Sequence, residues 1–247
     1  GLLGGQDAVW ILAALLLWWN GLAFRREATA GVGLALATLA PTIAGTLALP
    51  LLASRRPAAV WFLAAMVPLG AYTLALVGLD GLRDFLGLMT LSAGGDEYGL
   101  NPGKMYNLLG LLLRAFPGLA LETARWISWG ALLAATGLLV ALWWGKGRQM
   151  RLELAGLTVV LAVFTSPHLH SHSLAFLLLP LLAVCLQVRR RSQALSLALL
   201  PALSTAMLLA SFFSLAWSYA LAYLSMLGLA AALTWSLARR PAAEEAQ

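Results

Sequence analysis

The chain has 247 residues, of which 61% are hydrophobic and only 11% are charged. Because about a quarter of the residues in soluble domains are charged, this composition excludes an ordinary soluble domain and predicts a polytopic membrane protein. The net charge of +6 does not indicate nucleic-acid binding, since the basic residues stand in short clusters between apolar runs. The single cysteine, Cys185, lies inside an apolar run, so we expect neither an intramolecular disulfide nor a cysteine-based metal site.

Apolar runs follow one another along the chain, and most of them reach the roughly 17–25 residues that a membrane-spanning helix needs. They cover residues 8–24, 29–53, 58–79, 121–144, 152–165, 173–188, 194–213 and 215–237. We therefore predict an all-α protein with one transmembrane bundle over residues 1–240 and about eight or nine membrane helices. A disordered cytoplasmic tail is predicted at 241–247. The chain opens on Gly1 without a basic stretch, so we expect no signal peptide and a further N-terminal part in the full protein.

Basic clusters between the runs predict the topology. They are Arg25-Arg26, Arg55-Arg56, Lys146/Arg148/Arg151, Arg189-Arg190-Arg191 and Arg239-Arg240. The positive-inside rule places all of them in the cytoplasm, and we expect the bacterial inner membrane as the location. The outer side then receives the long segment 80–120 and the turn after residue 165. The ten tryptophans are predicted to lie at the two interfaces, as an aromatic belt.

Residues 29–53 do not fit a single crossing, because an arginine pair stands at each end. Pro41 lies in the middle, and a break there gives two helices of about 18 Å each. Such a pair would enter from the cytoplasm, turn near Pro41 and return, which is tolerated where protein or a wet cavity satisfies the backbone. A single span with a proline kink is the alternative.

The outer segment is predicted to hold a short interfacial helix at 81–91, a flexible stretch at 92–103 and a second short helix at 104–116. Lys104 and Arg114 could bind a lipid-linked phosphate, since cations at the membrane interface find phosphate readily. Ordinary contact with lipid headgroups is the alternative. Asn107 and Arg83 are further candidates for phosphate or sugar contacts.

All three histidines fall within one turn between two apolar runs, at His168, His170 and His172. Pro167 should end the preceding helix near residue 165, because it lacks a backbone N–H and disfavours helix before it. Polar side chains between two membrane helices are costly to expose to hydrocarbon. We therefore predict that these imidazoles donate hydrogen bonds to a phosphate or a sugar. A divalent cation such as Zn²⁺ is an alternative ligand, and a water-exposed turn without any ligand is the simplest alternative.

Four stretches together resemble glycosyltransferase family 87, a family of multi-spanning enzymes in the GT-C class. They are Gly5-Gln6-Asp7 before the first helix, Leu39-Ala40-Pro41-Thr42 with Leu49-Pro50-Leu51-Leu52, the pair 76–86 and 104–112 in the outer segment, and Ser166-Pro167-His168-Leu169-His170. The chain differs from the family pattern at Ala40, where lysine is usual, and at His172-Ser173, where a Tyr-Asp pair is common.

The resemblance implies an enzyme that moves a sugar, often mannose, from a polyprenyl-phosphate donor to a lipid or glycan acceptor on the outer membrane face. It implies that an Asp or Glu on a loop upstream of Gly1 acts as the catalytic base, so no catalytic base is assigned in this chain. The candidate donor-binding residues are then His168, His170, His172, Lys104, Asn107, Arg83, Gln6 and Asp7. We assign no cofactor, and a divalent cation is the one candidate. A transporter or lipid flippase and a non-catalytic membrane subunit are the other function classes.

Overall fold

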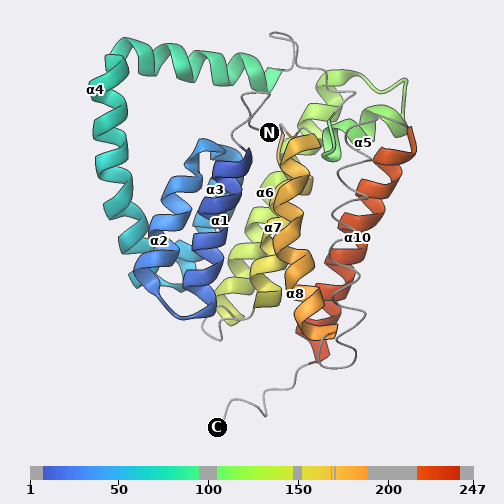
Figure 1. The fold of residues 1–247 in the computed structure, drawn as a ribbon. Coiled ribbons are helices and arrows are strands. Elements are labelled where there is room, and N and C mark those ends of the chain that lie inside the picture. Colours follow the sequence, from blue (N-terminus) through green and yellow to red (C-terminus); the bar gives the residue numbers. More distant parts are fainter. Residues whose placement is uncertain are drawn as a thin grey trace.

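The computed structural model describes residues 8–94, 105–146, 152–167, 169, 171–188 and 216–239. Every regular element in this part of the chain is a helix, so the predicted all-α class is confirmed there. In chain order the elements are α1 Ala8–Ala23, α2 Glu27–Leu36, η2 Ala37–Leu39, α3 Pro41–Ser54, α4 Arg56–Gly94, α5 Leu108–Ala115, α6 Leu121–Lys146, α7 Leu152–Thr165, η5 Ser171–Leu177, α8 Leu178–Val188 and α10 Ala216–Arg239 (Figure 1). The helix predicted at 194–213 and the tail at 241–247 lie outside the described residues.

Three of the described helices are long and apolar enough to cross a membrane, judged by length and composition. They are Pro57–Leu88 within α4, Leu121–Lys146 and Trp217–Ala238. Five further apolar helices of the described part have 10–17 residues, and α5 has eight. The three long helices indicate membrane association, whereas the predicted eight or nine spans are not all present as helices of full membrane length.

The helical structure is interrupted at Ala40, where the chain reverses direction. Ala40 is outside helical geometry, at φ −111° and ψ 80°, and Pro41 begins α3 at a position where its missing N–H is not needed. Glu27, at the start of α2, forms an ion pair with Arg55, just after α3, with Arg55 Nε 3.2 Å from Glu27 Oε2. The two helices are therefore antiparallel, and both arginine pairs lie at the same end of the bundle. This agrees with the two-helix prediction and not with one kinked span.

The ion pair is only partly exposed, with 11% of the Arg55 side chain and 25% of the Glu27 side chain accessible. Burial lowers the pKa of Arg55, and repulsion from the neighbouring Arg25 lowers it further. An arginine still keeps its charge at neutral pH. The pair therefore remains ionised and holds the two helix ends together.

Helix α2 lies between α1 and α4, and glycines allow both contacts. A Cβ atom at Gly33 would lie 2.4 Å from the backbone nitrogen of Trp18 in α1. On the other side of α2, a Cβ atom at Gly31 would lie 2.4 Å from the carbonyl oxygen of Ala58 in α4. The three helices therefore approach more closely than any larger residue would allow.

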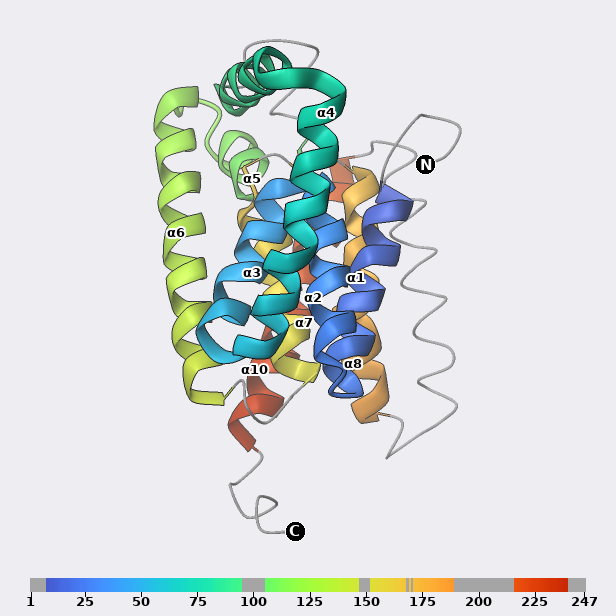
Figure 2. The same cartoon turned by 90° about the vertical axis from the view of Figure 1, so that its left-hand side faces the viewer.

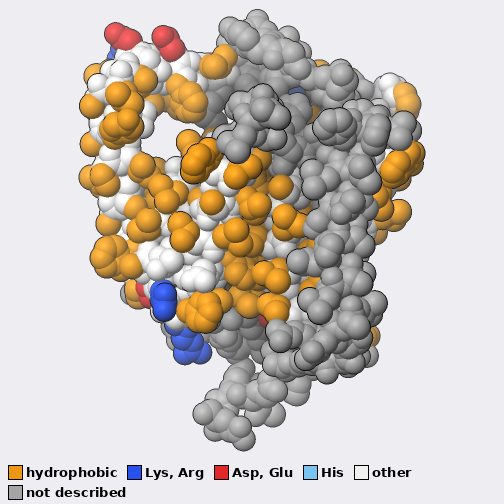
Figure 3. Space-filling view, in the orientation of Figure 1, with side chains coloured by type: hydrophobic (Ala, Val, Ile, Leu, Met, Phe, Trp, Pro, Cys, Tyr) orange, Lys and Arg blue, Asp and Glu red, His pale blue; other side chains and the backbone are white. Residues whose placement is uncertain are grey.

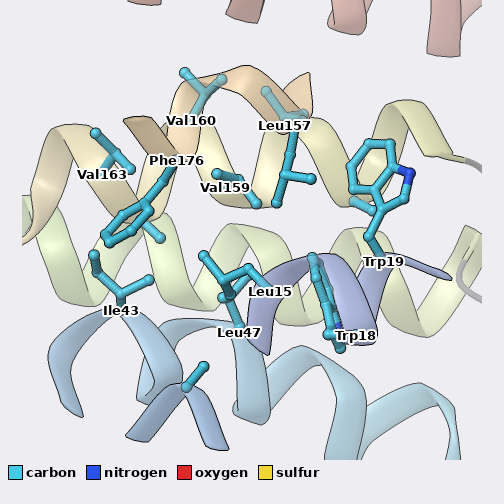
Figure 4. Close-up of a cluster of buried hydrophobic side chains, with 14 of the residues drawn as sticks. Leu15, Trp18, Trp19, Ile43, Leu47, Leu157, Val159, Val160, Val163 and Phe176 are labelled. Carbon is cyan, nitrogen blue, oxygen red and sulfur yellow. The ribbon is translucent and has the colours of Figure 1, made fainter. Parts of the chain in front are cut away.

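Helix α7 is the centre of the bundle and is in contact with α3, α6, α8 and α10. Eleven of its 14 residues are buried, among them Leu157, Val159 and Val163, which face Leu15 and Phe176 across the core (Figure 4). An apolar helix that is surrounded by protein on all sides needs no match to membrane thickness. This explains why α7 is shorter than a membrane span.

The predicted tryptophan belt is wrong for three residues. Trp18, Trp19 and Trp143 are buried in the core, at 0%, 5% and 3% exposure. Trp143 Nε1 donates to the hydroxyl of Thr158 at 2.8 Å, which satisfies its polar atom inside the bundle. Other tryptophans are on the surface, as the belt requires: Trp10, Trp61, Trp126, Trp144, Trp217 and Trp235.

Helix α4 has a sharp bend at Gly78, where φ is +68° and ψ −177°. We call residues 56–77 the stem and residues 79–94 the arm. The stem runs along α2, and the arm crosses above the ends of α1–α3 (Figures 1 and 2). The helix predicted at 81–91 corresponds to the arm, which the non-helical backbone of Gly78 separates from the stem. The second short helix predicted in this segment corresponds to α5, which is shorter than the predicted 104–116.

The helices alternate in direction, so the described basic clusters meet at the lower end in Figure 1. The C-terminal ends of α1, α3, α6 and α10 lie there. Helix α5, the C-terminal end of α7 and the N-terminal end of α10 lie on the opposite side of the bundle. The prediction for 173–188 needs one correction, since residues 171–177 form a 3₁₀ helix before α8 begins. Pro167 ends α7 as predicted, because α7 stops at Thr165.

Candidate functional site

Polar side chains gather at the end of the bundle opposite the arginine pairs. We call them the polar cluster, and its members come from the start of α3, the segment leading into α5, the last turn of α5, the turn after α7 and the first turns of α10. They are Thr42, Tyr106, Asn107, Arg114, Ser166, Ser218, Tyr219 and Tyr223. Buried polar groups require hydrogen-bond partners, and the cluster provides these partners internally.

Asn107 connects α5 to the turn after α7. Its Oδ1 accepts a hydrogen bond from the Gly110 N–H at 2.9 Å, so the side chain caps the N-terminus of α5. Its Nδ2 donates to the carbonyl oxygen of Ser166 at 2.7 Å. Asn107 has 0% exposure. The side chain predicted to contact a ligand is thus engaged with protein atoms and holds two segments together.

The turn after α7 is held from two further directions. The hydroxyls of Ser166 and Thr42, the latter in the first turn of α3, share a hydrogen bond at 2.9 Å. The backbone N–H of Tyr106 donates to the carbonyl oxygen of Leu169 at 3.1 Å. The broken helix pair, the outer segment and this turn therefore form one connected unit.

Arg114 connects α5 to α10. Its Nη2 donates to the carbonyl oxygen of Met105 at 2.7 Å and to the hydroxyl of Tyr223. Its guanidinium carbon lies 3.8 Å from the ring centroid of Tyr219, which is a close cation–π contact. Tyr219 and Tyr223 are four residues apart on α10 and so face the same side.

Tyrosine contacts complete this junction. The rings of Tyr219 and Tyr106 stack with their centroids 4.5 Å apart. The Tyr106 hydroxyl shares a hydrogen bond with the hydroxyl of Ser218 at 3.1 Å, and the Tyr223 hydroxyl donates to the carbonyl oxygen of Asn107 at 3.1 Å. Every contact crosses between the outer segment and α10, so the start of α10 is fixed to α5.

An apolar groove begins at Tyr223 and continues between α5, α7 and α10. Its volume is about 290 Å³, and its lining residues are Leu111, Val160, Leu161, Phe164, Tyr223, Met226, Leu227 and Ala230. Among the lining side chains, that of Tyr223 carries a hydroxyl, which accepts a hydrogen bond from Arg114. A groove with this composition suits a hydrocarbon chain whose polar end lies near Tyr223.

The other predicted site residues are not brought into the polar cluster by the described structure. Arg83 is on the arm, pairs with Asp80 at 3.2 Å and has 78% of its side chain exposed. Gln6, Asp7, Lys104, His168 and His170, together with the side chain of His172, lie outside the described residues, and predictions for them remain predictions. Within the described part, no three His, Cys, Asp or Glu side chains are grouped as metal ligands.

Sequence reasoning missed Thr42, Ser218, Tyr219 and Tyr223. A signal was present, because Ser218, Tyr219 and Tyr223 are polar side chains within a span that is otherwise apolar. Such residues generally face protein or a cavity. Their partners could not be identified from spacing, since Arg114 and Tyr223 are 109 residues apart.

Comparisons with family models, with curated proteins and with solved structures found no match to this chain. A function for the chain therefore has to be inferred from the site itself.

Proposed function

We propose that this chain is the membrane-embedded part of a glycosyltransferase that transfers a sugar, mannose or a related one, from a polyprenyl-phosphate donor to a lipid or glycan acceptor. The observation that supports this most directly is the apolar groove whose lining includes Tyr223, because the Tyr223 hydroxyl is hydrogen-bonded to Arg114. A polyprenyl phosphate has this same division into a long hydrocarbon chain and an anionic head. Arginine is the side chain best suited to bind phosphate.

The proposed topology places the arginine clusters in the cytoplasm of the bacterial inner membrane and the polar cluster on the outer side. The short helices then complete the spans together with their neighbours, and the α2–α3 pair enters and leaves on the cytoplasmic side. The Glu27–Arg55 ion pair supports this, because it brings both arginine pairs to one end. The polar cluster then lies at the depth of the outer headgroups, where a lipid phosphate is available.

In the proposed mechanism an acceptor hydroxyl displaces the phosphate at the anomeric carbon of the donor sugar. A base removes the hydroxyl proton, and hydrogen-bond donors stabilise the negative charge that develops on the leaving phosphate. His168, His170 and Lys104 are our candidates for those donors. The tie between Leu169 and Tyr106 supports a histidine turn beside α5, because Leu169 is the residue between His168 and His170.

Filling the groove should weaken donor binding. Ala230 lines the groove, and Ala231 follows it on the exposed side of α10. We expect Ala230→Phe to raise the KM for a polyprenyl-phosphate sugar about tenfold, which corresponds to roughly 1.4 kcal/mol, whereas Ala231→Phe should leave it unchanged. The measurement is transfer of radiolabelled sugar by the full protein in lipid vesicles. Equal KM values for the two variants would contradict a donor site in the groove.

Removing the histidines should slow transfer without loss of folded protein. We expect His168→Ala and His170→Ala each to lower kcat about 10²-fold, the typical loss when one donor to a developing anion is removed. The same vesicle assay measures this, with membrane expression as the control for folding. If both variants transfer sugar at the unaltered rate, the turn has no role in the reaction. Movement of the lipid across the vesicle membrane without transfer would instead favour a lipid flippase.

A further inference from the structure

The stem of α4 separates from the bundle before it reaches the arm. At its start it is packed against α2, where Ala58 and Ala59 are buried at 0% and 5% exposure. From residue 71 to residue 80 every residue is exposed, so no protein covers any face of this part in the described structure. Between residues 71 and 77 most side chains are apolar, including Leu74, Leu76 and Val77, and the Thr73 hydroxyl donates to the Leu69 carbonyl of its own helix. A helix with apolar residues on every face is suited to hydrocarbon.

A hollow lies between the stem, the arm and the top of the α1–α3 layer. Figure 3 shows it as an opening in the space-filling surface, with hydrophobic side chains along its border. The opening passes through the molecule in this view, so the hollow is open at both sides and is not a closed cavity.

The arm is amphipathic, and the direction of its apolar face indicates at which depth of a bilayer the hollow lies. Asp80, Arg83 and Asp84 share one face by helical spacing, and the opposite face carries Leu82, Phe85 and Leu86. Acidic side chains of the arm lie on its upper edge, away from the hollow (Figure 3). The apolar face of the arm is therefore directed toward the hollow. An interfacial helix has this orientation when its apolar face is inserted into the acyl-chain boundary.

The length of the stem agrees with this placement. Residues 56–77 extend roughly 33 Å at 1.5 Å per residue, close to the approximately 30 Å thickness of the hydrocarbon layer. With the arginine pair at its lower end, the stem spans this layer and the arm lies flat at the opposite surface. The hollow beneath the arm is then at the depth of the acyl chains.

We propose that this hollow is a lateral bay filled by acyl chains of bilayer phospholipids, with the arm of α4 as its roof. The proposal depends on the membrane placement given above and is independent of the glycosyltransferase activity. Lipid is favoured as the occupant because exposed apolar side chains occur around the whole stem between residues 71 and 77, the Thr73 hydroxyl is bonded within its own helix, and no single face is distinguished for packing against another helix. Because the bay is open at both sides, its lipids exchange with the surrounding bilayer.

The bend at Gly78 directs the arm across the bay and so positions its roof. Its φ of +68° combined with ψ near 180° is accessible to glycine alone. A Cβ at this position would meet nothing within 4 Å, so it is the backbone angle and not a lack of space that requires glycine. Gly87, within the arm, likewise has open space where a Cβ would be added, and its φ is not positive, which makes it a matched control.

The test uses fluorescent labels on single cysteines, introduced into a Cys185→Ala background at each position from 71 to 77. The full protein is placed in phosphatidylcholine vesicles with or without brominated acyl chains, which quench on contact. We expect quenching at all seven positions with no 3.6-residue period. Helix α6 provides the comparison, since labels at exposed Leu133 and Leu138 should be quenched and a label at buried Leu139 should not.

Three results would overturn the proposal. A 3.6-residue period of protection on the stem would mean that protein fills the hollow, and its loss on dilution with lipid would identify a second copy of the chain. Quenching by aqueous iodide along the stem would mean a water-filled space. A label at position 85 measures whether the arm lies against the acyl chains. We expect Gly78→Ala to reduce quenching of this label by brominated lipid and Gly87→Ala to leave it unchanged. Equal quenching in the two variants would show that the bend does not form the roof.

Discussion

Replacing Gly33 by alanine should lower the free energy of unfolding by about 3 kcal/mol, at the upper end of the range for overpacked interiors. The new Cβ would lie 2.4 Å from the backbone nitrogen of Trp18 and 2.9 Å from the carbonyl oxygen of Ala14. Backbone atoms of a helix cannot rotate away, so α1 and α2 would have to separate. Gly31→Ala should have a similar effect, because its Cβ meets the Ala58 carbonyl oxygen of α4 at 2.4 Å.

Gly45→Ala is the matched control, since it makes the same change inside α3 where nothing lies within 4 Å of the added Cβ. Alanine is preferred to glycine within helices by roughly 0.5–1 kcal/mol, so this variant should be as stable as the unaltered protein or slightly more stable. Unfolding by denaturing detergent in mixed micelles measures the difference. If Gly33→Ala and Gly45→Ala have the same free energy of unfolding, α1 and α2 do not approach each other as closely in the protein as described here.

Replacing Asn107 by alanine should lower the free energy of unfolding by about 3 kcal/mol. The change removes the cap of α5 and leaves two buried backbone groups, the Gly110 N–H and the Ser166 carbonyl, without the Asn107 side chain. Each buried group that loses its partner costs about 1–3 kcal/mol. Asn107→Asp keeps an acceptor for the cap and loses the donor to Ser166. It also buries a charge, so it should not restore stability.

The control for this change is Asn20→Ala, on the exposed side of α1. A surface substitution of this kind should stay within about 0.5 kcal/mol. The same detergent titration measures both variants. If Asn107→Ala were as stable as Asn20→Ala, the tie between α5 and the turn after α7 would not contribute to folding, and the polar cluster would have to be described differently.

The helices could be predicted largely because membrane helices are marked by their ends. Pro167 ends α7, arginine pairs bracket the α2–α3 pair, and Pro41 marks its break. The errors arose where the local sequence pattern does not determine whether a residue is buried or which backbone conformation it adopts. A tryptophan near an arginine pair resembles an interface residue, yet Trp18 is fully buried in the core, where α1 is packed closely against α2. A boundary between the run 58–79 and the helix 81–91 was predicted, but the left-handed backbone of Gly78 was not, since in a sequence this glycine is indistinguishable from a helical one such as Gly70.

The candidate site was predicted only in part, for a reason of distance along the chain. Composition and the positions of polar residues pointed to the segment before α5 and to the Ser166-Pro167 turn, and the structure brings these two together through Asn107. The role of Asn107 within the site, as a cap and a tie, depends on which carbonyl lies opposite. The tyrosines of α10 depend on the packing of α10 against α7, which no spacing rule specifies.

The junction between α5 and α10 has a consequence for biosynthesis. A ribosome releases Arg114 109 residues before Tyr223, and Tyr106 112 residues before Ser218. Until α10 is inserted, the guanidinium, the phenol and the carbonyls of this region must be satisfied by water, lipid heads or the translocation machinery. Nascent chains that end before residue 216 therefore present an arginine and a tyrosine without their α10 partners.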